Sequence, residues 1–226
     1  MMLTEELTFA SYPVFSVSLA THSMMKVEPE VIAKDTASFL ERWSDRVETR
    51  GIYSTAGFTA DADLMLWWIG QSADDIQQML LEFKRTLLGR QTRQRHAWLG
   101  LVRPAEFAAD HLPAFMKGAP PKKYACVYPF VRSPEWYLLD PAERGALLKE
   151  HGEGGREYPD VLANTTSAFG LGDHEWILAF EADGLDRIVE LIRRLRATEA
   201  RRYTSVETPF ITGIRKDVEA AVIEVF

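Results

Sequence analysis

The two halves of this chain repeat one pattern of apolar and acidic residues after a shift of 112 residues, close to half of the 226-residue length. Asp61 falls on Asp173, and Trp68 falls on Phe180. Apolar residues at helical spacing coincide in the same register, with Ile76 on Ile188, Met79 on Leu191 and Phe83 on Leu195. We interpret the repeat as a duplicated β-α-β-β-α-β unit.

Apolar periodicity predicts the elements of the first half. Strands are expected at residues 12–19, 52–58, 64–69 and 98–102, with a hairpin turn at 59–63. One helix is expected to start at an N-cap, Asp35, and a second at Ser72, which is followed by two aspartates in the first turn.

The second half shows the same order of elements. Strands are expected at 124–131, 176–180 and 210–211, and helices from Asp140 and over 185–195. The chain is therefore expected to be an α+β protein, with two ferredoxin-like halves whose sheets lie side by side as a barrel-like sandwich with the helices outside. We place the halves at 1–105 and 123–226, joined by a linker at 106–122.

The composition and charge of the chain argue against several classes of protein. The chain is 46% hydrophobic, with a net charge of −7 and a pI near 5.3, which argues against general nucleic-acid binding. The single Cys126 excludes an internal disulfide. No apolar run reaches the roughly 18 residues of a membrane span, and no signal peptide is visible, so a cytoplasmic protein is expected.

Two histidines have a context that suggests chemistry. His151 ends the second half's first predicted helix and is followed by glycines at 152, 154 and 155. It is either a helix C-terminal histidine with a glycine cap or the single protein ligand of a haem iron. His111 lies in the linker between an aspartate and Leu-Pro, and is either a general base or an exposed loop residue.

Aromatic residues and arginines supply further candidates. Tyr128 lies in an aromatic strand that is followed by Trp136 and Tyr137, which suggests either core packing or a redox-active tyrosine beside a flat ligand. Six arginines gather near the C-terminus, either as a solvated helix face or, for one or two of them, as a carboxylate site: Arg187, Arg193, Arg194, Arg196, Arg201 and Arg202.

Several ordered motifs identify a resemblance to a known family. They include YPFVRS at 128–133, EWYLL at 135–139, EHG at 150–152, DHEWILAF at 173–180 and RATEAR at 196–201. The first half agrees through ADADLM at 60–65 and HLPAF at 111–115. From about residue 50 to about residue 214, the chain closely resembles the actinobacterial coprohaem decarboxylases of the chlorite dismutase-like superfamily.

The resemblance implies a dimeric α+β barrel fold and a homopentamer. It implies that hydrogen peroxide drives oxidative removal of two propionates from iron-coproporphyrin III, the substrate and redox cofactor, to give haem b. His151 matches the iron ligand, Tyr128 the radical-forming tyrosine and His111 the distal base. Arg132 and Arg196 match positions near propionates.

Two further residues are expected near the cofactor, Trp136 and Asn164. Chlorite dismutases carry a distal arginine thirteen residues after the iron ligand, where this chain has Asn164, which argues against chlorite decomposition. The chain also has Pro134 where the family usually has tyrosine. The alternatives are a non-catalytic haem-binding protein and another haem peroxidase or chlorite dismutase-like enzyme on the same fold.

Overall fold

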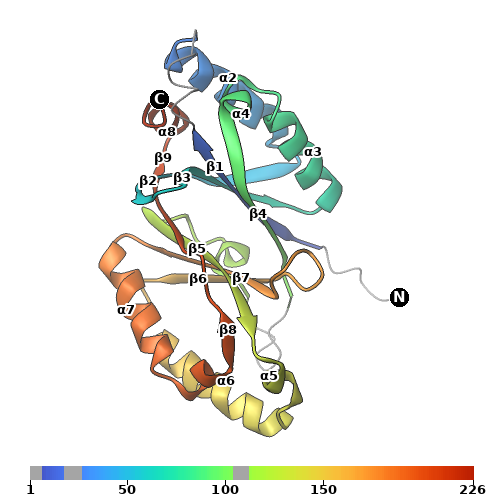
Figure 1. Cartoon of the computed structure of the whole chain (residues 1–226), viewed down its shortest axis with the longest axis vertical. Coiled ribbons are helices and arrows are strands. Elements are labelled where there is room, and N and C mark those ends of the chain that lie inside the picture. Colours follow the sequence, from blue (N-terminus) through green and yellow to red (C-terminus); the bar gives the residue numbers. More distant parts are fainter. Residues whose placement is uncertain (1–6, 18–26, 104–111) are drawn as a thin grey trace. The chain divides into compact units, whose positions relative to one another are not determined.

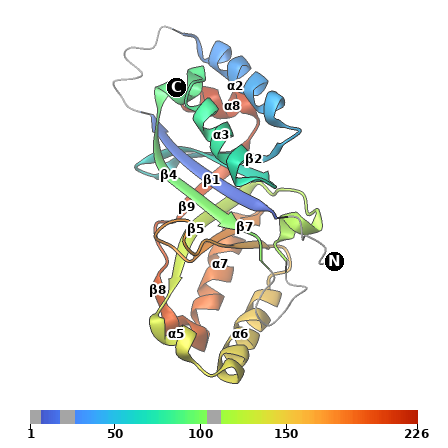
Figure 2. The same ribbon diagram turned by 90° about the vertical axis from the view of Figure 1, so that its right-hand side faces the viewer.

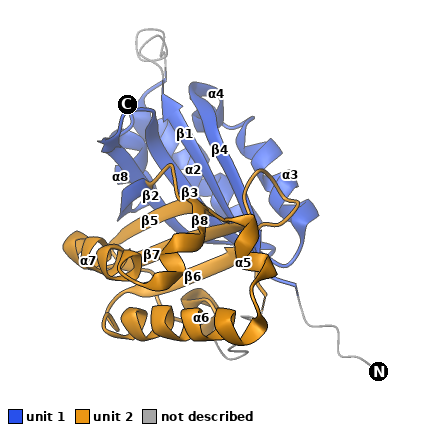
Figure 3. Cartoon of the chain, turned by 60° about the horizontal axis from the view of Figure 1, so that its bottom comes forward, with its two compact units in different colours: residues 1–101, 211–226 blue, residues 102–210 orange. Residues whose placement is uncertain are grey.

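The computed structural model describes residues 7–17, 27–103 and 112–226, which form two compact units (Figure 3). Unit 1 comprises residues 1–101 together with 211–226, and unit 2 comprises residues 102–210. Within each unit, neighbouring strands pair antiparallel, and a hydrophobic core lies between these strands and the helices of that unit. None of the helices in the described ranges has the length and hydropathy that a membrane span requires.

Unit 1 has the strand order β4-β1-β3-β2-β9 (Figure 1). Its elements, in chain order, are β1 (Phe9–Val17), α2 (Pro29–Trp43), β2 (Val47–Thr59), β3 (Ala62–Gly70), α3 (Ala73–Phe83), α4 (Leu87–Gln91), β4 (Thr92–Leu101), β9 (Ile211–Lys216) and α8 (Val218–Ile223). The predicted hairpin turn is confirmed, since β2 ends at Thr59 and β3 begins at Ala62.

The helix starts of unit 1 follow from capping. The Ser72 side chain accepts a hydrogen bond from the Asp75 main-chain N–H at 3.2 Å, which confirms the predicted start of α3. The predicted N-cap Asp35 is wrong, because α2 already begins at Pro29, a residue suited to the first helical position. The Asp35 carboxylate instead accepts from the Leu87 N–H at 2.8 Å, beside the start of α4.

Unit 2 has the strand order β8-β5-β7-β6. Its elements, in chain order, are η1 (Ala114–Lys117), β5 (Tyr124–Arg132), α5 (Pro134–Leu138), α6 (Pro141–Arg156), β6 (Leu162–Ser167), β7 (Trp176–Ala182), α7 (Leu185–Arg196), η2 (Glu199–Tyr203) and β8 (Thr204–Val206). Figures 1 and 2 both show α6 and α7 packed side by side. The expected helix start at Asp140 is confirmed, since its carboxylate accepts from the Ala142 N–H at 2.8 Å.

The residues related by the 112-residue shift lie in equivalent elements. Trp68 lies in β3 and Phe180 in β7, while Ile76 and Ile188 are buried in α3 and α7. Numbered in chain order within each unit, the first four strands have the same spatial order, fourth-first-third-second. The sequence repeat therefore corresponds to one arrangement of strands and helices present in both units.

The second half was expected to extend from residue 123 to residue 226, but its C-terminal segment belongs to the other unit. Ile211–Phe226 belongs to unit 1, because β9 pairs with β2 and α8 packs on α2. The expected strand at 210–211 is therefore only half right. Ile211 begins β9, whereas Phe210 lies outside any strand and packs its ring 4.4 Å from that of Tyr128 in unit 2.

Candidate active site

His151 lies within α6, not at its end. The helix continues through all three glycines to Arg156, so the expected glycine stop is wrong. The neighbouring helix provides the reason: Gly154 is buried against Arg194, whose guanidinium lies 3.3 Å from the place of an added Cβ. Arg194 also forms a two-pronged ion pair with Glu157 at 2.8–3.0 Å, just beyond the end of α6.

The surroundings of His151 keep its imidazole neutral. Burial, and then the positive charge of Arg132, lower the pKa of His151 from its ordinary value of 6.5 to about 4. The Nδ1 atom lies 3.3 Å from the Thr198 hydroxyl. A neutral imidazole is the protonation state that binds a metal ion, so this side chain suits an iron ligand at neutral pH.

This pKa predicts how the ligand-free protein responds to acid. Because the folded pKa lies below the unfolded value of 6.5, His151 adds stability above pH 6.5 that is lost as the pH falls towards 4. The loss amounts to about 3 kcal/mol of unfolding free energy. Urea titrations between pH 7 and pH 4 should show that His151→Gln loses less stability than the wild type by about that amount; parallel profiles would contradict the prediction.

Arg132 is held in aromatic surroundings at the end of β5. Its guanidinium carbon lies 4.1 Å from the ring centre of Trp136 and 4.8 Å from that of Phe130. Its Nη1 donates to the Ala200 carbonyl at 2.8 Å. Burial lowers the pKa of Arg132 to about 10, so the group is still a cation at neutral pH. A partly desolvated arginine is well suited to bind a carboxylate.

Tyr128 is buried in β5 on the sheet face that carries the unit 2 core. Its ring packs against Phe210 and lies 6.1 Å from Phe180. Burial, followed by the negative charge of Glu207, raises the pKa of the Tyr128 phenol well above 10. The phenol therefore keeps its proton throughout the physiological pH range.

Two of the six clustered arginines lie beside Tyr128. Arg196 and Arg201 both form ion pairs with Glu207, and Arg196 lies 5.6 Å from the Phe210 ring. The other four form partly exposed ion pairs, Arg187 with Asp160, Arg193 with Glu190, Arg194 with Glu157 and Arg202 with Glu199. Two cations sharing one carboxylate leave a local positive charge in an acidic protein.

The sheet register separates Asn164 from Tyr128. Asn164 pairs with Ala179, whereas Tyr128 pairs with Leu178, so the two side chains point to opposite faces of the sheet. Asn164 is fully buried and donates to the Ala179 carbonyl and to Glu181 at 3.2 and 3.0 Å. It also accepts from the Phe115 N–H at 3.0 Å, so it ties the segment before β5 to the sheet.

The candidate residues differ in whether the structure describes them. His111, the expected base, lies outside the described residues. In unit 2, Arg132 stacks on Trp136 and its charge acts on His151. The charge of Glu207, the ion-pair partner of Arg196, acts on both Arg132 and Tyr128. Sequence reasoning assigned no role to Thr198, Glu207 or the buried Glu181. Thr198 lies in the motif at 196–201, and Glu181 is an acid in the apolar strand 176–182.

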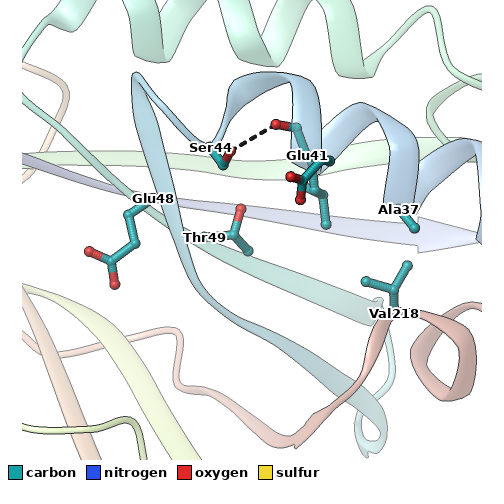
Figure 4. Close-up of a pocket in the computed structure, with 7 residues that line it drawn as sticks. Ala37, Glu41, Ser44, Glu48, Thr49 and Val218 are labelled. Atoms are coloured by element: carbon teal, nitrogen blue, oxygen red, sulfur yellow. Dashed lines mark hydrogen bonds between the residues drawn. The ribbon is translucent and has the colours of Figure 1, made fainter.

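A surface hollow in unit 1 is lined by none of these residues (Figure 4). Its lining includes the carboxylates of Glu41 and Glu48 and, in the part of the chain that is described, neither lysine nor arginine. The Ser44 hydroxyl there donates to the Glu41 carbonyl at 2.8 Å. An acidic lining would repel an anionic ligand, so we do not assign the carboxylate-binding site to this hollow.

Comparison with known families identifies the class of protein to which this antiparallel α+β fold belongs. Residues 30–216 match the family described as chlorite dismutase, and the chain belongs to that family. A relative named "coproheme decarboxylase" from Mycolicibacterium smegmatis is 49% identical over 210 residues, which cover 92% of this chain and 91% of the relative. Another of that name, from Oceanobacillus iheyensis, is 24% identical over 208 residues, 83% of each chain.

Solved structures share the fold. A variant of chlorite dismutase from Candidatus Nitrospira defluvii matches with a TM-score of 0.87 at 23% identity, covering 98% of this chain and 96% of that one. The chlorite dismutase of the same organism in complex with imidazole matches with a TM-score of 0.86 at 22% identity, covering 96% and 94%. This similarity establishes a chlorite dismutase-like α+β fold.

Proposed function

We propose that this protein is a coprohaem decarboxylase, a haem-synthesising oxidoreductase. It would use hydrogen peroxide to decarboxylate two propionate side chains of iron-coproporphyrin III oxidatively, so that their carboxyl groups leave as carbon dioxide and haem b is released. This is the last step of coproporphyrin-dependent haem synthesis. The observation that carries the proposal is the group of charged residues in unit 2, where Arg132 acts on a neutral His151 and Glu207, paired with Arg196, acts on a protonated Tyr128. The 49% identity to a relative of that name supports it.

The donor set fits an iron porphyrin with carboxylate side chains. His151, a partly buried neutral imidazole, would hold the iron, and the bound iron porphyrin would supply the reaction with peroxide. We assign Arg132 and Arg196 to the propionates, because guanidinium groups bind carboxylates in a two-pronged geometry. Trp136, buried beneath Arg132, would form an aromatic wall for the macrocycle.

We assign Tyr128 as the residue that abstracts hydrogen from a propionate side chain. The bound iron porphyrin and peroxide supply the oxidising power. Tyr128 would first lose its phenolic hydrogen atom to this oxidant and then take a hydrogen atom from the propionate side chain. The raised pKa of Tyr128 means that the phenol holds the hydrogen that it must lose. Its packing between Phe210 and Phe180 would hold the ring in one orientation.

We assign His111 as the base that takes a proton from hydrogen peroxide, a weak acid that binds ferric iron best as its anion. General-base catalysis contributes about 100- to 10,000-fold. His111→Ala should therefore slow the first reaction with peroxide by about that factor while coprohaem still binds. Stopped-flow rates should show the defect shrinking at high pH; a deficit that does not change with pH would exclude this role.

The proposal extends to the architecture of the two units and to the assembly of the protein. We infer that each unit descends from a ferredoxin-like half and that the halves form the dimeric α+β barrel, supported by the matching strand orders. We further propose a cytoplasmic homopentamer. Exposed apolar side chains in unit 2, among them Leu138, Phe169 and Leu171, are compatible with burial against another subunit.

The masses of the porphyrin products test the proposed function. Purified protein should be loaded with iron-coproporphyrin III and titrated with hydrogen peroxide, and the porphyrin masses followed. We expect stepwise loss of two carboxyl groups and haem b as the end product. Bound porphyrin that bleaches with its four propionates intact would favour the non-catalytic haem-binding alternative or another haem peroxidase.

A further inference from the structure

The partner of His151 lies in the turn between α7 and η2. The Thr198 side chain is buried, and its Oγ1 lies 3.3 Å from Nδ1 of His151. The same hydroxyl donates its hydrogen to the Leu195 carbonyl at 2.8 Å. A hydroxyl has one hydrogen but two lone pairs, so towards His151 it acts as an acceptor. The hydrogen of this contact therefore belongs to Nδ1.

We propose that Thr198 is a positioning residue that selects the Nδ1–H tautomer of His151 and thereby leaves the Nε2 lone pair for the iron. The proposal rests on the proposed function only in naming iron as the metal at Nε2. In a neutral imidazole, the hydrogen bond at one nitrogen determines which nitrogen can bind a metal. Thr198 thus acts through His151 and not on the substrate.

The turn that carries Thr198 is attached on two sides. The Glu199 N–H donates to the carboxylate of Glu150, the residue directly before His151, at 3.2 Å. Arg132 Nη1 donates to the Ala200 carbonyl from the end of β5. These bonds fix the hydroxyl relative to the turn of α6 that bears the imidazole, as the orientation of a ligand requires.

The acceptor on Nδ1 is a neutral hydroxyl. The carboxylate of the preceding residue, Glu150, accepts a hydrogen bond from the Glu199 N–H. A neutral acceptor orients the imidazole without drawing its proton away as a carboxylate would. His151 is therefore expected to bind as a neutral imidazole with its ring orientation fixed.

The first experiment needs no iron. Long-range ¹H–¹⁵N correlation spectra of ¹⁵N-labelled, ligand-free protein at pH 7 report the tautomer of each neutral histidine. We expect His151 to carry its hydrogen on Nδ1 in the wild type and in Thr198→Ser, and to shift towards Nε2–H in Thr198→Val, which has the same shape but no hydroxyl. A wild-type Nε2–H tautomer, or a Thr198→Val spectrum identical to the wild type, would overturn the proposal.

The second experiment uses the protein loaded with ferrous coproporphyrin III. Resonance Raman spectra should show a shifted or broadened iron–imidazole band in Thr198→Val and a wild-type band in Thr198→Ser, with about 10-fold weaker binding of the iron porphyrin in the former. An unchanged band and affinity in Thr198→Val would count against the proposal. A wild-type spectrum without any band that depends on His151 would refute the ligand assignment instead, and the iron-free tautomer would still decide the role of Thr198.

Discussion

Replacing Tyr128 with phenylalanine is expected to stop haem b formation while coprohaem stays bound. The variant keeps the ring that packs 4.4 Å from Phe210 and loses only the hydroxyl whose hydrogen the proposed reaction uses. Affinity should fall less than about tenfold, because one neutral hydrogen bond contributes about 1 kcal/mol. Peroxide should still be consumed, and mass spectrometry should find the porphyrin with all its propionates and no release of carbon dioxide.

Tyr124→Phe is the matched control for this prediction. Tyr124 lies in the same strand and packs on the same core, so its variant should form haem b at the wild-type rate. Normal haem b formation by Tyr128→Phe would exclude Tyr128 from hydrogen abstraction. Trp136 and Tyr137 would then be the next residues to replace.

Replacing His151 with alanine is expected to remove the iron–imidazole bond and most of the activity. Loss of a residue that only supports a metal ligand already costs about 10- to 100-fold, so loss of the ligand itself should lower turnover more than about 100-fold. Coprohaem should still dock through its propionates, because Arg132 and Arg196 are unchanged. Absorption and resonance Raman spectra of the loaded variant should show the altered axial ligation.

Added imidazole separates loss of the ligand from loss of the fold. If His151→Ala leaves a space of the right shape, millimolar imidazole should restore part of the wild-type spectrum. His174→Ala, in the same unit, should behave as the wild type. A His151→Ala protein with an unchanged spectrum and normal turnover would show that another residue binds the iron.

Sequence patterns predicted most of the elements because the forces behind them are local. Ser72 and Asp140 cap their helices through contacts with residues two or three positions along the chain. Apolar runs on both sides of a polar turn predicted β2 and β3 and the hairpin between them. Asp35 misled the prediction because an aspartate near a helix start can equally serve another element, here the N-terminus of α4.

The candidate site depended more on the resemblance than on local rules. From the residues alone, His151 and Tyr128 each had two explanations, and the family motifs favoured one. The motif at 196–201 contains Thr198, but neither signal could show that this residue contacts His151, 47 residues away in the chain. Neither could show that Glu207 pairs with Arg196 and Arg201, because these contacts depend on the turn after α7. Contacts across such separations follow from the packing of elements, which the local pattern does not encode.

The sequence by itself determined the repeated order of strands and helices, the helix starts at Ser72 and Asp140, and the residue types of the site. The tertiary structure decided where α6 ends, which sheet face Asn164 occupies and which unit β9 joins. The physical reason is clearest in α6. Each of its glycines costs about 1 kcal/mol of helix stability relative to alanine, which predicts a stop after His151, but packing of Arg194 on Gly154 and its ion pair with Glu157 favour continuation.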